Sequence, residues 1–342
     1  MGRSSEGWKM VRSEGGRMEL EELARIRQVV ETKSEFLCVA HKDADADSLG
    51  SALAFAEYLE SLGKHVVVAV PDPLPQNLSY LPGYPRVNQF EAPDDAVAVA
   101  FDAGSPDRFG SLGERIRRAP LTILFDHHAS NEGFGELSIV DRDAAATGVI
   151  IFEVLKEWGA TVSPDAATNL YAAIFTDTGG FRHDNTTAEV LRLGAELAEL
   201  GADVVFVALK SYKSRPQSTL RLQSLSASAA RYELDGRLIW SEVTLEMLET
   251  AGAKMEETEG IIDVLQSLDS MECALLFKQE GPRLSKVSVR TRGDLAAYSV
   301  VGDIGGGGHF RAAGAEVEMT LGEVEAIVLG KVRAVLAGGT SS

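Results

Sequence analysis

Acidic and imidazole side chains gather where two apolar runs of this sequence end. They are His41, Asp45 and Asp47 after the run at residues 36–40, and Asp126, His127 and His128 after the run at residues 121–125. Three of the six histidines therefore lie in two acid-rich segments. Carboxylate and imidazole ligands together suit divalent transition metals such as manganese better than calcium or a thiolate zinc site. The sequence predicts a metal centre.

The acids behind His41 occupy alternate positions, Asp43, Asp45 and Asp47. In an extended segment alternate side chains share one face, so all three carboxylates would point at one spot. The alternative is an acidic turn that caps a helix beginning near Ser48, because acids favour helix N-termini.

Two further acids stand at the ends of predicted elements. Asp102 follows the apolar run at residues 96–101, where an ordinary turn is the alternative, and Asp177 follows an apolar helical stretch at residues 170–176. Four independent placements of this kind favour one shared metal site over four separate turns.

Alternating strands and helices position these side chains. Apolar, β-rich runs predict strands buried on both faces at residues 36–40, 65–70, 96–101 and 121–125. Helices with start and stop signals are predicted at residues 48–62, 147–158 and 164–176. This alternation indicates an α/β domain with a parallel sheet, in which ligands bind beyond the carboxyl ends of the strands. The acids and histidines lie at that edge.

The second half of the chain changes character and predicts a smaller α+β domain. After a helix at 187–200 and a basic connector at 206–222, strands are expected at 237–243, 272–279 and 286–292, and helices at 256–268 and 321–337. The predicted organisation is a disordered tail at residues 1–18, a metal-binding domain at 19–205, a linker at 206–222 and a second domain at 223–342.

Length, charge and cysteine content limit the classes of function. A chain of 342 residues fits about two domains. The net charge of −18 argues against binding to long nucleic acid, which depends on neutralising many phosphates. No apolar stretch is long enough for a membrane span and no signal-peptide core is present, so no membrane partner is expected. Cys38 and Cys273 lie in strand-like runs as core residues, which suits a reducing cytoplasm.

The order of these motifs resembles the DHH phosphoesterase family, named for the triplet at residues 126–128. The matching motifs are His41-x-x-x-Asp45-x-Asp47-x-x-Gly50-Ser51, Asp102, the triplet and Thr176-Asp-Thr-Gly-Gly-Phe-Arg182. Gly305-Gly-Gly-Gly-His309 and Ala312-Ala-Gly314 are similar to the glycine-rich signature of the DHH-associated C-terminal domain. Length and domain pair look most like the nanoRNase/pAp phosphatase group, which implies an active site in the cleft between the two domains.

This resemblance implies a centre of two divalent ions, Mn²⁺. One ion would be held by His41 and Asp45, the second by Asp47, His127 and Asp177, with Asp102 bridging both. Two such ions can share a hydroxide, lower its pKa and clamp the phosphate oxygens during in-line displacement. Asp126 would orient a histidine ligand through its ring N–H. His128 would hydrogen-bond the scissile phosphate and assist the leaving oxygen.

Further residues are predicted to bind the substrate. Gly305, Gly306, Gly307 and Gly308 precede His309. Their backbone N–H groups would form an anion-binding nest, with a flexible loop as the alternative. Ser288, Arg290 and Arg292 alternate and share a face of a predicted strand. The resemblance implies that Arg290 reaches the terminal phosphate or base of the substrate, and Arg292 could instead be a solvated turn residue. It also favours Arg182 as a phosphate contact, with a surface residue as the alternative.

The expected function is a Mn²⁺-dependent phosphohydrolase that degrades short oligoribonucleotides to mononucleotides and converts 3′-phosphoadenosine 5′-phosphate (pAp) to AMP. A phosphodiesterase acting on c-di-AMP or pApA is the nearest alternative, because the motifs hold phosphate rather than base. A non-catalytic nucleotide sensor on the same fold is a third alternative, which missing metal ligands would favour. The resemblance also implies a homodimer.

Overall fold

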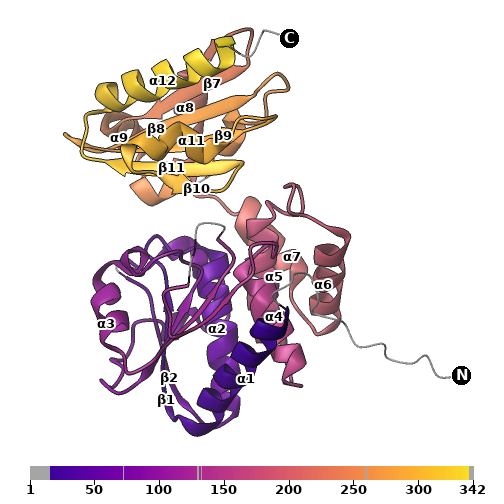
Figure 1. The fold of residues 1–342 in the computed structure, drawn as a ribbon. Helices are drawn as coiled ribbons and strands as arrows, with labels where there is room; N and C mark the ends of the chain where they lie inside the picture. Colours follow the sequence, from indigo (N-terminus) through magenta and orange to yellow (C-terminus); the bar gives the residue numbers. More distant parts are fainter. Residues whose placement is uncertain (1–15, 72, 129–130, 132, 259, 339–342) are drawn as a thin grey trace, which may run out of the picture. The chain divides into compact units, whose positions relative to one another are not determined.

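The computed structural model describes residues 16–338 except residues 72, 129, 130, 132 and 259, and it consists of two compact units, Met1–Lys213 and Ser214–Ser342 (Figure 1). Of the predicted disordered tail, residues 1–15 lie outside the described part of the chain, whereas residues 16–18 belong to helix α1 (Gly16–Thr32). The division between the units falls inside the predicted linker at 206–222. That segment is largely helical, because α7 (Val204–Tyr212) ends the first unit and α8 (Gln217–Ser228) begins the second.

A five-stranded parallel sheet forms the centre of the first unit. Its strands are β1 (Glu35–Ala40), β2 (His65–Ala69), β3 (Val97–Phe101), β4 (Thr122–Asp126) and β5 (Leu137–Val140), in the order β2-β1-β3-β4-β5. All four predicted strands are confirmed, and the α/β fold class with them. The fifth strand, β5, was not predicted, because its apolar run is short and interrupted by Ser138.

Helices cover both faces of this sheet, which explains why its strands are apolar throughout. One face is covered by a core that includes α1, α2 (Ala46–Ser61), α4 (Thr147–Glu157) and α5 (Pro164–Asp177), and α6 (Ala188–Glu199) and α7 pack on α5. The other face packs against the 3₁₀-helix Pro106–Leu112 and α3 (Gly113–Arg118), so that α2 and α3 lie on opposite sides of the sheet (Figure 1).

Two glycines let α2 and α4 pack closely on α5. A Cβ on Gly50 of α2 would lie 2.6 Å from the backbone oxygen of Asn169, and a Cβ on Gly148 of α4 would lie 2.6 Å from the Ala173 Cβ. Because real Cβ atoms do not approach so closely, a larger residue at either position would push the helices apart. The starts of α2 and α4 both carry residues of the site described below.

The second unit is built on one mixed sheet with the strand order β10-β11-β9-β8-β7-β6. Its strands are β6 (Arg231–Glu233), β7 (Leu238–Val243), β8 (Cys273–Gly281), β9 (Leu284–Thr291), β10 (Gly307–Gly308) and β11 (Ala312–Val317). One core contains α11 (Ala297–Val301) and α12 (Leu321–Gly338), and the other contains α8, α9 (Leu245–Ala251) and α10 (Ile261–Leu265). None of the described helices is long and apolar enough to cross a membrane.

The helix predicted at residues 256–268 is wrong in its length. The structure has a 3₁₀-helix at Met255–Thr258 and then the short helix α10. Gly260, which precedes α10, adopts φ +79°. This left-handed conformation cannot continue a right-handed helix, so the two short helices remain separate.

Candidate metal centre

The strand register brings the main site residues of the first unit to one level. Ala40 pairs with Phe101 of β3, and Phe101 pairs with Phe125 of β4. The residues that follow them are His41, Asp102 and Asp126. These three therefore leave adjacent strands side by side at the carboxyl edge of the sheet, where ligands bind in such folds.

His41 is buried and presents one ring nitrogen to two carboxylates. Its Nδ1 lies 2.7 Å from the backbone oxygen of Lys42, a contact that assigns the ring proton to Nδ1 and leaves Nε2 as a ligand atom. This Nε2 lies 3.4 Å from Oδ2 of Asp102 and 3.8 Å from Oδ2 of Asp45. The three side chains could together hold one metal ion.

Asp45 also caps helix α2. Its Oδ1 accepts the Ser48 backbone N–H at 2.8 Å, within a reciprocal capping box. The helix-cap alternative is therefore confirmed, and the extended alternation of three acids is wrong. Asp43 lies in the turn before the helix with φ +57°, and Asp47 lies in the first helical turn. Only the second oxygen of Asp45 faces His41.

Asp47 is held by the start of a helix one hundred residues later. Its Oδ2 accepts the Thr147 N–H at 2.7 Å, and its Oδ1 accepts the Gly148 N–H at 2.8 Å. The N-cap residue of α4, Ala146, has no capping side chain of its own. The carboxylate of Asp47 thus caps α4 from outside, where the helix dipole favours a negative charge.

Asp102 faces both ligand histidines with different oxygens. Its Oδ2 lies 3.4 Å from His41 Nε2, and its Oδ1 lies 3.3 Å from His127 Nε2. The Thr147 hydroxyl donates to Oδ1 at 3.0 Å and fixes the carboxylate plane. The backbone of Asp102 adopts φ +62°, a strained conformation that is typical of functional sites. Asp102 thus presents one carboxylate oxygen to each of the two histidines.

His127, Asp47 and Asp177 form a second group that could hold a metal ion. The His127 Nδ1 lies 3.1 Å from the carbonyl oxygen of Ala144, so its Nε2 is again left as the ligand atom. This Nε2 lies 3.7 Å from Asp47 Oδ2 and 3.6 Å from Asp177 Oδ2. Asp177 is the last residue of α5, as the sequence predicted for a helix end.

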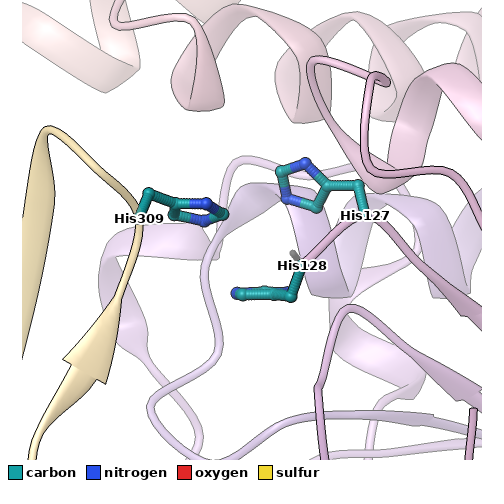
Figure 2. A group of neighbouring side chains, drawn as sticks. All are labelled: His127, His128 and His309. Carbon is teal, nitrogen blue, oxygen red and sulfur yellow. The ribbon is translucent and has the colours of Figure 1, made fainter. Parts of the chain in front are cut away.

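The structure corrects the role expected of Asp126. The sequence resemblance implied that Asp126 orients a metal-ligand histidine, but its Oδ1 accepts from Nδ1 of His128 at 2.7 Å. Its Oδ2 accepts from the Asn131 amide at 2.5 Å. In extended backbone, residues two apart share a side, so Asp126 reaches His128 and not His127. The two imidazoles lie 5.1 Å apart at 63° to one another, and Figure 2 shows them on neighbouring positions of the loop after β4.

Burial couples the charges of this cluster. Burial, with the Asp102 charge, raises the pKa of Asp177 to about 7 although His127 opposes the shift. Burial alone would lower the pKa of His41, but the hydrogen bond to Asp102 and the charge of Asp45 raise it to about 9. The raised pKa values of Asp177 and His41 both reflect excess negative charge among buried groups, which a cation would neutralise. Divalent cations would supply positive charge to these oxygen and nitrogen donors.

Two known domain families match this chain. The DHH family, N-terminal domain, matches residues 35–174, and the DHHA1 domain matches residues 237–336. The "bifunctional oligoribonuclease and PAP phosphatase NrnA" of Thermus thermophilus is 32% identical over 280 residues, which cover 81% of this chain and 82% of the relative. The chain belongs to the DHH family. It is accordingly a metal-dependent phosphoesterase.

Two further comparisons extend the DHH assignment. The "probable bifunctional oligoribonuclease and PAP phosphatase NrnA" of Streptococcus mutans is 26% identical over 277 residues, which cover 80% of this chain and 87% of the relative. The crystal structure of an "exopolyphosphatase-related protein" from Bacteroides fragilis superposes with a TM-score of 0.84 at 24% identity, covering 93% of this chain and 98% of that one. This likeness shows that the fold is shared.

A strained loop after α5 carries Arg182 in the first unit of this DHH protein. Gly179, Gly180 and Phe181 all have positive φ, at 60°, 72° and 62°. The Arg182 Nε donates to the Gly179 carbonyl at 2.5 Å, and its guanidinium lies 4.8 Å from the ring centroid of Tyr212. Arg182 is thus held between a carbonyl and an aromatic ring, five residues after the end of α5.

In the DHHA1 domain, Ser288 and Arg290 alternate with buried valines on β9 and share its half-buried face, as predicted. Arg292 does not, because β9 ends at Thr291. The Arg292 guanidinium instead donates to the carbonyls of Leu268 at 3.1 Å and Gln266 at 2.8 Å. It therefore stabilises the chain after α10.

The glycine run of the DHHA1 domain forms a tight hairpin, which replaces the predicted nest. The backbone N–H groups of Gly305, Gly306 and His309 donate to the carbonyls of Gly302, Val301 and Ala312. Gly307 and Gly308 pair with Gly314 and Ala313 of β11. A Cβ on Gly306 or Gly308 would lie 2.7 Å or less from neighbouring atoms, so glycine is needed for packing there. Two of the four expected anion donors, the N–H groups of Gly305 and Gly306, are therefore engaged within the domain.

Three residues of the DHH site were not found from the sequence. They are Thr147, Asn131 and Asn185, which bind Asp102, Asp126 and the backbone of Asp177. Asn185 Nδ2 donates to the Asp177 carbonyl at 3.3 Å and to the Ala145 carbonyl at 3.1 Å, and so links α5 to the loop before α4. No residue type or spacing marks these side chains, because their partners are distant in sequence or belong to the backbone.

Proposed function

We propose that this DHH protein is a Mn²⁺-dependent phosphohydrolase that degrades short oligoribonucleotides to mononucleotides and dephosphorylates pAp to AMP. The two relatives described above carry names for these two activities. The net charge of −18 supports short substrates, because long nucleic acid would be repelled along most of its length.

The observation that carries the proposal is the position of Asp102 between two ligand groups. His41 and Asp45 lie on the side of its Oδ2, and His127 lies on the side of its Oδ1 with Asp47 and Asp177. Two ions held in this way would polarise the phosphate oxygens and lower the pKa of the attacking water. The donor set of carboxylates with two imidazoles suits manganese.

The side chains around the centre complete the reaction. Asp126 holds His128 through Nδ1, so that Nε2 of this ring is left to hydrogen-bond the scissile phosphate and to give a proton to the leaving oxygen. Arg182 would bind a phosphate oxygen of the substrate, and a planar guanidinium can do so with two parallel hydrogen bonds. Ser288, Arg290 and His309 of the DHHA1 domain would bind the rest of the substrate.

Hydrolysis assays test this proposal. Purified protein with Mn²⁺ should convert RNAs of two to five nucleotides to mononucleotides and pAp to AMP, and EDTA should abolish both reactions. The same assay includes c-di-AMP and pApA, and faster turnover of these would favour the cyclic dinucleotide alternative. If the protein with Mn²⁺ hydrolyses neither the short RNAs nor pAp, the proposal is wrong.

A further inference from the structure

Two aromatic side chains of the second unit lie together and open to solvent. Phe310 is 44% exposed and Tyr298 is 47% exposed. Their ring centroids are 6.3 Å apart, with an edge-to-face angle of 72°. Tyr298 belongs to α11, whereas Phe310 lies between β10 and β11, so two separate segments converge on this pair.

The chain around Phe310 is firmly held. Its carbonyl accepts the Ala297 N–H at 2.7 Å and the Thr291 hydroxyl at 3.2 Å. The Arg311 guanidinium lies 4.9 Å from the Phe310 ring centroid and donates to the Gly293 carbonyl. The ring is therefore preorganised at the surface, which reduces the entropy that a ligand would lose on binding to it.

We propose that Phe310 and Tyr298 form a stacking platform for a nucleobase of the substrate. The inference rests on the proposed function and adds a contact for the part of a nucleotide that arginines and metals do not bind. Every base has a π face, so an aromatic platform accepts any sequence, as the degradation of mixed short RNAs requires. His309, a proposed substrate contact, directly precedes Phe310, and the positively charged Arg311 guanidinium lies over one face of the Phe310 ring, which leaves the other face for a base.

The size of the patch favours a base over a protein partner. A stable protein interface buries about 800 Å² on each side. Two half-exposed aromatic side chains offer about 200 Å². That area matches a flat heterocycle, and the adjacent cation matches the phosphate that accompanies it.

The platform is tested by removing the Phe310 ring from the protein and a base from the substrate, separately and together. KM is measured for a diribonucleotide and for two analogues that lack the base at one or the other end, with wild-type protein and with Phe310→Ala. Stacking predicts that Phe310→Ala raises KM for the intact dinucleotide by about 5- to 150-fold. The variant should not change KM for the analogue that lacks the stacked base. Phe310→Trp should keep wild-type KM and Phe310→Leu should not, although both retain apolar bulk.

The outcomes separate the platform from the proposed function. An equal rise in KM on all three substrates, or no rise on any, would overturn the platform while RNA hydrolysis itself stands. If the wild-type protein cleaves no RNA, the proposed function fails. The platform is then tested by the binding of a dinucleotide that contains 2-aminopurine, measured in the presence of EDTA. Stacking predicts fluorescence quenching that Phe310→Ala removes, and quenching that survives this substitution would overturn it.

Discussion

Asp102 owes its bridging position to contacts that no local sequence pattern contains. Its backbone is turned to φ +62° at the end of β3, and one of its oxygens accepts the hydroxyl of Thr147 from the start of α4. Thr147 also donates its backbone N–H to the Asp47 carboxylate. Thr147 therefore holds one candidate ligand from each group, Asp102 through its hydroxyl and Asp47 through its backbone N–H.

Replacing Thr147 by valine removes the hydroxyl and keeps the shape and the backbone N–H. We expect the affinity for Mn²⁺ to fall by about 10- to 100-fold, as is usual when a partner of a metal ligand is lost. Calorimetric titration with MnCl₂ measures this affinity. Thr147→Ser, which retains the hydroxyl, is the control and should stay near the wild-type affinity. Unchanged affinity in Thr147→Val would mean that the hydrogen bond does not orient Asp102.

Tyr212 is expected to hold Arg182 in position for phosphate. The cation–π contact at 4.8 Å should contribute about 0.5–1 kcal/mol at a partly exposed site. Tyr212→Leu should therefore raise KM for pAp by about two- to fivefold and leave kcat unchanged, whereas Tyr212→Phe should match the wild type. An equal rise in KM in both variants would assign the effect to the hydroxyl, and a lower kcat would contradict a pure binding role.

At the residue scale the sequence indicated the candidate metal ligands and their order, but not the side chains that hold them in place. His41, Asp45, Asp47, Asp102, His127 and Asp177 are brought together in two groups around Asp102. The pairing of Asp126 with His128 depends on the direction of the chain after β4, and Asn131 and Asn185 act on distant groups. Only the folded chain shows these contacts.

At the scale of elements, the site depends on how α2 and α4 sit on α5. Asp45 and Asp47 begin α2, Thr147 begins α4 and Asp177 ends α5. Gly50 and Gly148 allow the close packing that keeps these helix ends at the edge of the sheet. A change in helix spacing should therefore affect both stability and metal binding.

Gly148→Ala should destabilise the first unit by about 1–3 kcal/mol, because the new Cβ would overlap the Ala173 Cβ. The substitution should also weaken Mn²⁺ binding, because a shift of α4 would move the backbone N–H of residue 148 that holds Asp47. Gly330→Ala in α12 is the matched control, because a Cβ there meets nothing within 4 Å. That variant should be stabilised by up to about 1 kcal/mol. Urea denaturation measures both, and equal effects in the two variants would contradict the packing argument.

Glu153 of α4 gives the first unit a pH dependence outside the metal centre. Burial, together with the charges of Glu189 and Asp141, raises its pKa to about 7. A carboxyl group whose pKa is raised on folding favours the folded state at low pH, and this advantage is lost as the pH rises from about 4.5 to 7. Glu153→Gln should therefore be more stable than the wild type at pH 8, and the difference should shrink towards pH 4.5. Thermal unfolding at the two pH values measures this, and a difference independent of pH would refute the assignment.

The sequence predicted elements well where the hydrophobic pattern was strong. The strands β1, β3 and β4 at the centre of the first sheet are buried on both faces, so their apolar runs are unambiguous. β5 has only four residues, and the first four residues of β11 are alanine and glycine, which have low strand propensity. The helix expected at 256–268 failed at Gly260, whose left-handed backbone only the structure reveals.

At the scale of the whole molecule, a net charge of −18 coexists with a function that acts on anions. The metal centre resolves this conflict locally, because two divalent cations would reverse the field among the clustered carboxylates. The remaining negative surface would still oppose long nucleic acids. Chemistry thus depends on metal occupancy, whereas the surface charge disfavours long substrates.

Anomalous diffraction from crystals soaked in Mn²⁺ tests this account most directly. We expect two peaks in the first unit, one among His41, Asp45 and Asp102 and the other among Asp47, His127 and Asp177, with Asp102 contacting both. The structure offers a competing group at Asp102, Asp126 and His128. A single peak, or a peak on Asp126 and His128, would contradict the two-ion centre bridged by Asp102.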